Sequence, residues 1–76
     1  MEEKVLEMLK KIQPVYEFEP DVDFLEEGYL DSFDIANLMV MLEECFSIVI
    51  SPLETMPENF SSVSAICDLV KRSKGR

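Results

Sequence analysis

Ser32 is the residue whose type and setting point most directly to chemistry, because it stands in an acidic run where a helix is predicted to begin. The run reads Glu-Glu-Gly-Tyr-Leu-Asp-Ser-Phe-Asp over positions 26–34. A nucleophilic serine needs a neighbouring base, usually histidine, and the chain has no histidine. We therefore expect no catalysis by the chain itself. A helix amino end accommodates phosphate-bearing groups, so Ser32 is interpreted as a substrate for another enzyme.

The acidic side chains give weaker signals. Asp21 and Asp23 have the opening spacing of a calcium-binding loop, but Glu26 stands where the turn glycine belongs and Ser32 where the closing glutamate belongs. Paired carboxylates of the glycosidase kind need a cleft that raises one pKa, and a chain of 76 residues has little room for one. We expect a solvated acidic face and no metal site.

The two cysteines also lack the pattern of a site. Cys45 and Cys67 are far apart in the sequence, and without histidine they suggest neither a zinc ligand set nor a disulfide framework. We expect both to be reduced, packed thiols.

The elements that position Ser32 are predicted to be helical. Three main helices follow from apolar residues spaced three and four apart: Glu2–Gln13, Ser32–Phe46 and Ser62–Lys74. Pro14 ends the first helix, and Ser32 is expected to be the N-cap of the second. Pro57 starts a short helix that reaches Phe60. The expected fold class is all-α, a small bundle of three main helices plus one short helix, with residues 1–76 as a single domain.

Two connecting segments flank the second helix. Residues 14–30 are expected to form a long ordered loop anchored by four apolar residues, Phe18, Phe24, Leu25 and Leu30. Residues 47–51 are expected to form an extended connector. A seventeen-residue loop is unusual in a compact domain, so the first segment is expected to pack on the core and to serve function.

Charge is distributed unevenly along the chain. Residues 1–13 balance to zero, residues 14–60 hold twelve acids and no base, and the remainder carries +3, which sums to the net −9. Such acidity disfavours nucleic acid and anionic membrane as partners and favours basic protein surfaces. No apolar run is long enough to span a membrane, and the start does not read as a secretory signal. We expect a cytoplasmic monomer.

The sequence resembles the acyl and peptidyl carrier protein family over essentially its whole length. The resemblance rests on Asp31-Ser32-Phe33 at the start of the second helix, where the family has Asp-Ser-Leu, and on the later stretch from Pro57 to Val63. It implies an acyl-carrier-like fold with 4'-phosphopantetheine attached to Ser32, next to Asp31, by a magnesium-dependent transferase that uses coenzyme A. The arm's thiol would carry acyl or aminoacyl groups as thioesters, loaded by an adenylating ligase and delivered to downstream acyl- or aminoacyl-using enzymes.

The resemblance also implies a partner-binding face on the second helix. The matching positions are Phe33, Asp34, Ala36, Val40, Glu43 and Glu44. Glu43 and Glu44 lie near the negative end of the helix dipole, and partner recognition would give them a purpose there. Leu30 before the Asp-Ser pair and Asn37 five residues after the serine depart from fatty-acid synthase carriers, and the segment looks nearer to stand-alone carriers such as D-alanyl carriers. The alternative is a non-catalytic acidic adaptor that binds a basic partner.

Overall fold

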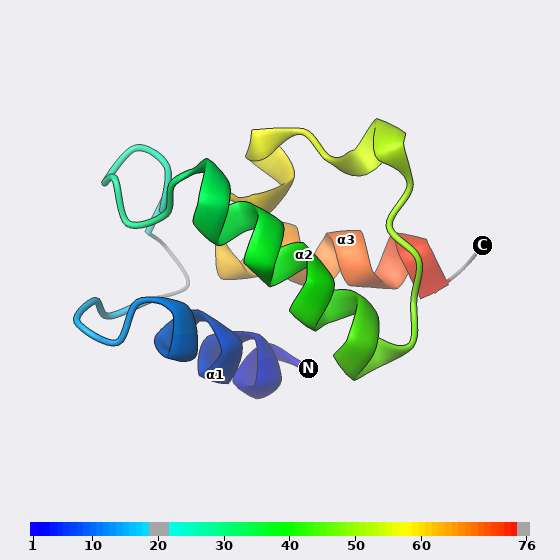
Figure 1. The fold of residues 1–76 in the computed structure, drawn as a ribbon, viewed down its shortest axis with the longest axis horizontal. Coiled ribbons are helices and arrows are strands. Elements are labelled where there is room, and N and C mark those ends of the chain that lie inside the picture. The colour runs from blue at the N-terminus through cyan, green and yellow to red at the C-terminus, as the bar shows by residue number, and fades with distance from the viewer. Residues whose placement is uncertain (19–21, 75–76) are drawn as a thin grey trace.

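A computed structural model of the chain describes residues 1–18 and 22–74. Its elements are α1 (Glu2–Ile12), α2 (Ser32–Phe46), the 3-10 helices η1 (Pro52–Glu54) and η2 (Pro57–Phe60), and α3 (Val63–Lys74). No strand occurs in these ranges. In Figure 1, α2 runs between α1 on one side and the η1–η2 segment on the other. The predicted all-α class is confirmed.

The element bounds differ from the sequence prediction by small amounts. Helix α1 ends at Ile12 and not at Gln13, and α3 begins at Val63 and not at Ser62. The short helix at Pro57–Phe60 is present as a 3-10 turn, but a second one, η1, was not predicted. It forms because Pro52 takes the first helical position and the Ser51 hydroxyl accepts a hydrogen bond from the Leu53 N–H at 3.2 Å.

The core lies where the apolar faces of the three helices meet. Helix α1 contacts both α2 and α3. Eight fully buried side chains of the three helices form its centre: Val5, Leu9, Leu38, Leu42, Val63, Ile66, Leu69 and Val70. The same three-and-four spacing that predicted the helices therefore also identified the faces that pack together.

The segment before α2 is held by aromatic rings. Tyr16 stacks on Tyr29 with ring centroids 4.3 Å apart, and Phe18 meets Phe24 edge-on at 4.9 Å. The N–H of Phe24, which is fully buried, donates to the Ser61 carbonyl at 2.6 Å and so joins this segment to the end of η2.

A turn at 24–28 completes this segment. The Asp23 carboxylate accepts hydrogen bonds from the Leu25 and Glu26 N–H groups, both at 3.0 Å. Gly28 takes a φ of 72°, which favours glycine. The expected anchors Phe18, Phe24 and Leu30 are buried and Leu25 is half-buried, so the predicted packing of the loop is confirmed for the residues described. Residues 19–21, which include Asp21 of the rejected calcium pattern, lie outside them.

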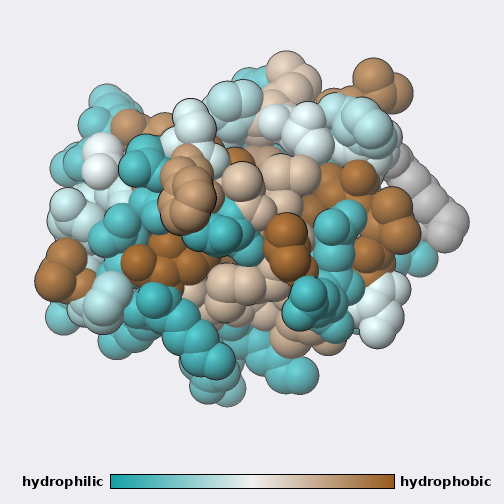
Figure 2. Space-filling model, viewed as in Figure 1, coloured by the Kyte–Doolittle hydropathy of each residue, from teal (hydrophilic) through white to brown (hydrophobic). Residues whose placement is uncertain are grey.

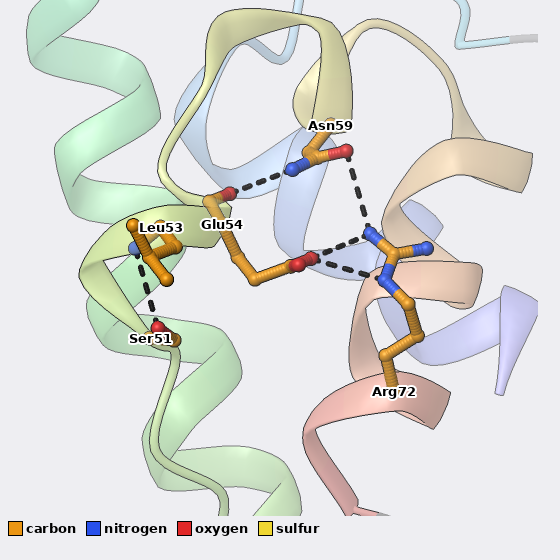
Figure 3. Close-up of polar contacts among 5 residues, drawn as sticks. All are labelled: Ser51, Leu53, Glu54, Asn59 and Arg72. Carbon is orange, nitrogen blue, oxygen red and sulfur yellow. Dashed lines mark hydrogen bonds and ion pairs between the residues drawn. The ribbon is translucent and has the colours of Figure 1, made fainter.

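The segment after α2 is held by polar contacts as well as by the buried side chains of Ile48, Ile50 and Phe60. The connector predicted over residues 47–51 is extended at Ser51, but Ser47 is left-handed with a φ of 53°, so the prediction was wrong for this residue. Residues 48–50 have no regular secondary structure, and the Ile50 N–H donates to the Glu43 carboxylate at 3.0 Å. Farther along, Arg72 of α3 donates through Nε and Nη2 to Glu54 Oε2 at 3.0 and 2.7 Å (Figure 3). The Asn59 amide donates to the Glu54 carbonyl at 2.8 Å and accepts from Arg72 at 3.4 Å. These bonds tie η1 and η2 to α3.

Candidate functional site

The amino end of α2 is capped by Asp31. The Asp31 carboxylate accepts a hydrogen bond from the Asp34 N–H at 2.8 Å, and the Asp34 carboxylate accepts one from the Asp31 N–H at 3.4 Å. This reciprocal arrangement is a capping box. The prediction that Ser32 is the N-cap was therefore wrong: Ser32 occupies the first helical position, because Asp31 is the residue with extended backbone and a side chain that reaches the third helical N–H.

The cap of α2 does not use the hydroxyl of Ser32. Ser32 is exposed, and no hydrogen bond within residues 1–18 and 22–74 uses its side chain. An exposed hydroxyl that has no structural duty can be esterified without breaking the fold. The first helical position also places an added negative group beside the unpaired N–H groups and the positive end of the helix dipole.

Asp34 joins the start of α2 to the end of α1. It is only 8% exposed, and its Oδ2 accepts a hydrogen bond from Gln13 Nε2 at 2.8 Å in addition to its bond within the capping box. Asp34 was expected to face partners, but the structure places it inside the fold. The reason is that Asp34 lies in the first turn of α2, within reach of the side chain of Gln13, the C-cap residue of α1.

The contact that Gln13 makes with Asp34 was not predicted from the sequence. Gln13 is the C-cap residue of α1, and its amide reaches a carboxylate 21 positions later in the chain. A polar residue before Pro14 reads as a helix end and nothing more, so no local signal could have identified this contact.

Four of the expected partner-facing residues share one exposed surface, which we call the α2 outer face: Phe33, Ala36, Val40 and Glu44. Phe33 is 73% exposed and Val40 53% exposed. Figure 2 shows apolar side chains among polar ones on the side of the molecule that α2 forms in this view. Glu43 differs, because it is half-buried and its carboxylate accepts the Ile50 N–H.

The two cysteines are in different environments. Cys67 is buried as expected, and burial raises the pKa of its thiol above the ordinary 9.0, with the Glu2 charge adding to the effect. Cys45 is exposed, so the prediction of two packed thiols was wrong for this residue, which lies near the end of α2. Both are free thiols.

Two other kinds of site are absent from the described ranges. No group of three or more histidine, cysteine, aspartate or glutamate residues there could hold a metal ion. No helix there has the length and apolar character to cross a membrane.

Comparison with known proteins points to one family. A family model described as phosphopantetheine attachment site matches residues 3–70. The chain is 32% identical to the D-alanyl carrier protein of Lactococcus lactis subsp. lactis (strain IL1403) over 76 residues, which cover 97% of this chain and 96% of that protein. It is 30% identical to the D-alanyl carrier protein of Abiotrophia defectiva over 74 residues, which cover 95% of this chain and 94% of that protein.

Proposed function

The chain belongs to the family of proteins with a phosphopantetheine attachment site, and from this premise we propose that Ser32 is the residue that holds the arm. Members of this family are carrier proteins with 4'-phosphopantetheine bound covalently to a serine. The observation that carries the proposal is the exposed hydroxyl of Ser32 at the first position of α2, while Asp31 performs the capping. The bound arm supplies a terminal thiol, on which cargo travels as a thioester.

The residues around Ser32 suit the group. Its phosphodiester would lie at the positive end of α2, where a negative charge is stabilised. The capping box fixes the backbone on both sides of Ser32, so the attachment point is held in place. Because the chain has no histidine, the base that removes the Ser32 proton has to come from a transferase. We expect no turnover by the carrier alone, in keeping with carrier proteins in general.

For the cargo we propose D-alanine. The support is that the relatives described as D-alanyl carrier proteins match over nearly their full lengths as well as that of this chain. The enzymes expected to act on the carrier are a phosphopantetheinyl transferase that uses coenzyme A and magnesium, an adenylating ligase that loads the thiol, and downstream enzymes that take the aminoacyl group. The cytoplasmic location and the monomeric state stay predictions.

For partner recognition we propose the α2 outer face. Its apolar residues Phe33 and Val40 are exposed, as is Glu44. Helix α2 has acidic residues and no basic one, and Glu44 supplies the negative charge of this face, while Lys11 of α1 lies beside Phe33 and Val40. A partner with a basic rim around an apolar contact would complement it. Asp34 is left out of this surface because it is buried, and Glu43 because its carboxylate holds the connector.

Intact-mass analysis tests the attachment site. Co-expression with a broad-specificity phosphopantetheinyl transferase should raise the mass by one phosphopantetheinyl group, and Ser32→Ala should abolish the increase. The matched control is Ser64→Ala, which removes an exposed serine near the start of α3 and should leave the increase intact. Modification that persists in Ser32→Ala, or no modification of the wild type with several transferases, would refute the proposal.

The cargo is tested separately on the modified protein. A D-alanine-activating ligase with ATP should load D-alanine onto the arm and should discriminate against L-alanine and fatty acids. A carrier that accepts the arm but is loaded only with another acid would refute the assignment of D-alanine and would leave Ser32 as the attachment site.

A further inference from the structure

Two connections join the end of α1 to the neighbourhood of the proposed attachment residue, and both start from Gln13. Through its side chain, Gln13 Nε2 donates to Asp34 Oδ2 at 2.8 Å, two residues after Ser32. Through its main chain, the Gln13 carbonyl accepts a hydrogen bond from the Tyr16 N–H at 3.3 Å. The ring of Tyr16 stacks on that of Tyr29, three residues before Ser32. Gln13 therefore holds the chain on both sides of Ser32.

The bond lengths at Asp34 show what the Gln13 amide controls. One carboxylate oxygen, Oδ2, accepts the Gln13 amide at 2.8 Å and also the Asp31 N–H at 3.4 Å. The second distance lies beyond the ordinary range of N–H···O hydrogen bonds, about 2.7–3.2 Å, so this bond is the weaker of the two. The bond to Gln13 therefore sets the orientation of the Asp34 side chain, and that orientation keeps Oδ2 within reach of the Asp31 N–H.

The other half of the capping box does not depend on Gln13. The Asp31 carboxylate accepts the Asp34 N–H at 2.8 Å, and this bond caps α2 by itself. Loss of the Gln13 amide should therefore leave α2 folded but release the main chain at Asp31, directly before Ser32. A positioning role of Gln13 can thus be separated from a purely structural one.

We infer that Gln13 is a positioning residue for the transfer of phosphopantetheine to Ser32, an inference that rests on the proposed attachment to this serine. In that transfer the Ser32 oxygen forms a bond to phosphorus, the bond from this phosphorus to the adenosine bisphosphate part of coenzyme A breaks, and the serine proton passes to a base of the transferase. The attacking and leaving oxygens have to lie roughly in line. Because a misplacement of about 1 Å can lower a rate about 100-fold, the backbone next to Ser32 has to be held, and Gln13 holds it through Asp34.

Steady-state kinetics of a phosphopantetheinyl transferase test this role with Gln13→Met, which keeps the length of the side chain and removes its donor. We expect kcat to fall about tenfold and the KM for the carrier to stay within about twofold, because the α2 outer face is unchanged. Lys10→Met, the same replacement at an exposed position in the last turn of α1, is the matched control and should change neither value. An unchanged kcat in Gln13→Met would overturn the inference. A raised KM with unchanged kcat would also overturn it, because it would indicate contact with the enzyme.

An exchange of donor and acceptor shows whether the bond itself matters. Gln13→Glu should slow the transfer at least as much as Gln13→Met, since two carboxylates then face each other. Adding Asp34→Asn lets the new amide donate to the carboxylate at position 13 while its oxygen still accepts the Asp31 N–H. We expect the double variant to recover most of the lost kcat, and Asp34→Asn alone to keep its activity. A double variant as slow as Gln13→Glu would overturn the inference, and so would an inactive Asp34→Asn, because a neutral acceptor preserves both hydrogen bonds.

Backbone order parameters of the unmodified proteins test the positioning without an enzyme. In Gln13→Met they should fall for residues 31–33 and keep their wild-type values for residues 38–42 in the middle of α2. Wild-type values at 31–33 would overturn the inference, and so would a fall along the whole of α2, which would show that Gln13 serves stability alone.

Intact mass of the wild-type carrier reports separately on the attachment site. An unmodified Ser32 after incubation with the transferase refutes the proposed function. An attached arm, together with Gln13 variants that are modified as fast as the wild type, refutes only the role of Gln13.

Discussion

The segments before and after α2 hold that helix in place by different physical means. Residues 13–18 and 22–30 pack through rings, with Tyr16 stacked on Tyr29 and Phe18 against Phe24. Residues 47–62 rely on carboxylates, with Glu43 accepting from Ile50 and Glu54 from Arg72. Both segments bury three apolar side chains, Phe18, Phe24 and Leu30 in the first and Ile48, Ile50 and Phe60 in the second. The second also leaves Val49, Leu53 and Met56 exposed.

This difference separates the carboxylates that hold the fold from those that are available to partners. At the start of α2, Asp31 forms the cap, Asp34 both completes the capping box and accepts a hydrogen bond from Gln13, and neither arrangement uses the Ser32 hydroxyl. Where polar bonds hold the chain, Glu43 and Glu54 are committed to the structure and Glu44 is left at the surface. The first segment should therefore respond to loss of apolar volume, and the second to loss of charge or to salt.

The largest effect is expected from Phe24→Ala. This ring is fully buried, so its removal should lower the free energy of unfolding by about 3–5 kcal/mol, measured by urea denaturation. That is a large part of the stability of a domain, typically about 5–15 kcal/mol. Val15→Ala, in the same segment but 80% exposed, should change it by less than about 0.5 kcal/mol. If Phe24→Ala lowered the free energy of unfolding by less than about 1 kcal/mol, packed rings would not be what holds the segment before α2.

Glu43→Ala should have the next largest effect, about 1.5–3 kcal/mol, because it leaves the N–H of the buried Ile50 without its charged acceptor. Glu44→Ala, one residue later and exposed, should change the unfolding free energy by less than about 0.5 kcal/mol. Equal losses in the two variants would show that Glu43 has no special role in holding the connector.

The same pair of residues separates stability from recognition. Glu44→Lys should leave the unfolding free energy nearly unchanged but slow association with the loading ligase, most strongly at low salt. Asp68→Lys, the same charge change at an exposed position of α3, is the control. An association rate unaffected by Glu44→Lys at low ionic strength would remove this residue from the proposed partner surface.

Asp31→Ala should lower the unfolding free energy by about 1 kcal/mol, because it removes the cap of α2. Ser32→Ala should cost less than about 0.5 kcal/mol, since the serine hydroxyl forms none of the side-chain bonds seen in the described ranges. A larger loss in Ser32→Ala than in Asp31→Ala would identify Ser32 as the N-cap and would contradict a Ser32 hydroxyl without a structural role. Thermal melts of unmodified protein suffice for the comparison.

The smallest effect is expected from Arg72→Ala. Its pair with Glu54 is partly exposed, at 44% for the arginine side chain, so the loss should be about 0–1 kcal/mol and should shrink as salt is raised. Melting temperatures at low and high ionic strength measure this. A salt-independent loss would mean that packing of the arginine stem, and not its charge, connects η1 to α3.

Most of the fold was predictable because the spacing of apolar residues within each helix indicates where that helix lies. Apolar spacing located the three main helices to within one residue at each end, and the anchors Phe18, Phe24 and Leu30 were predicted for the loop before α2. The 3-10 helix η1 was missed because three residues are too few to show a period. At the candidate site, the N-cap of α2 was predicted to be Ser32 but is Asp31.

The sequence by itself determined where the helices lie, how the acids are distributed and that no histidine is present to activate Ser32. Tertiary structure alone decided which acids are available: Asp34 pairs with Gln13 across 21 positions, and Glu43 turns to Ile50. The physical reason is that helical periodicity is a property of neighbouring residues. The partner of a carboxylate, in contrast, is chosen only when packing brings distant parts of the chain together.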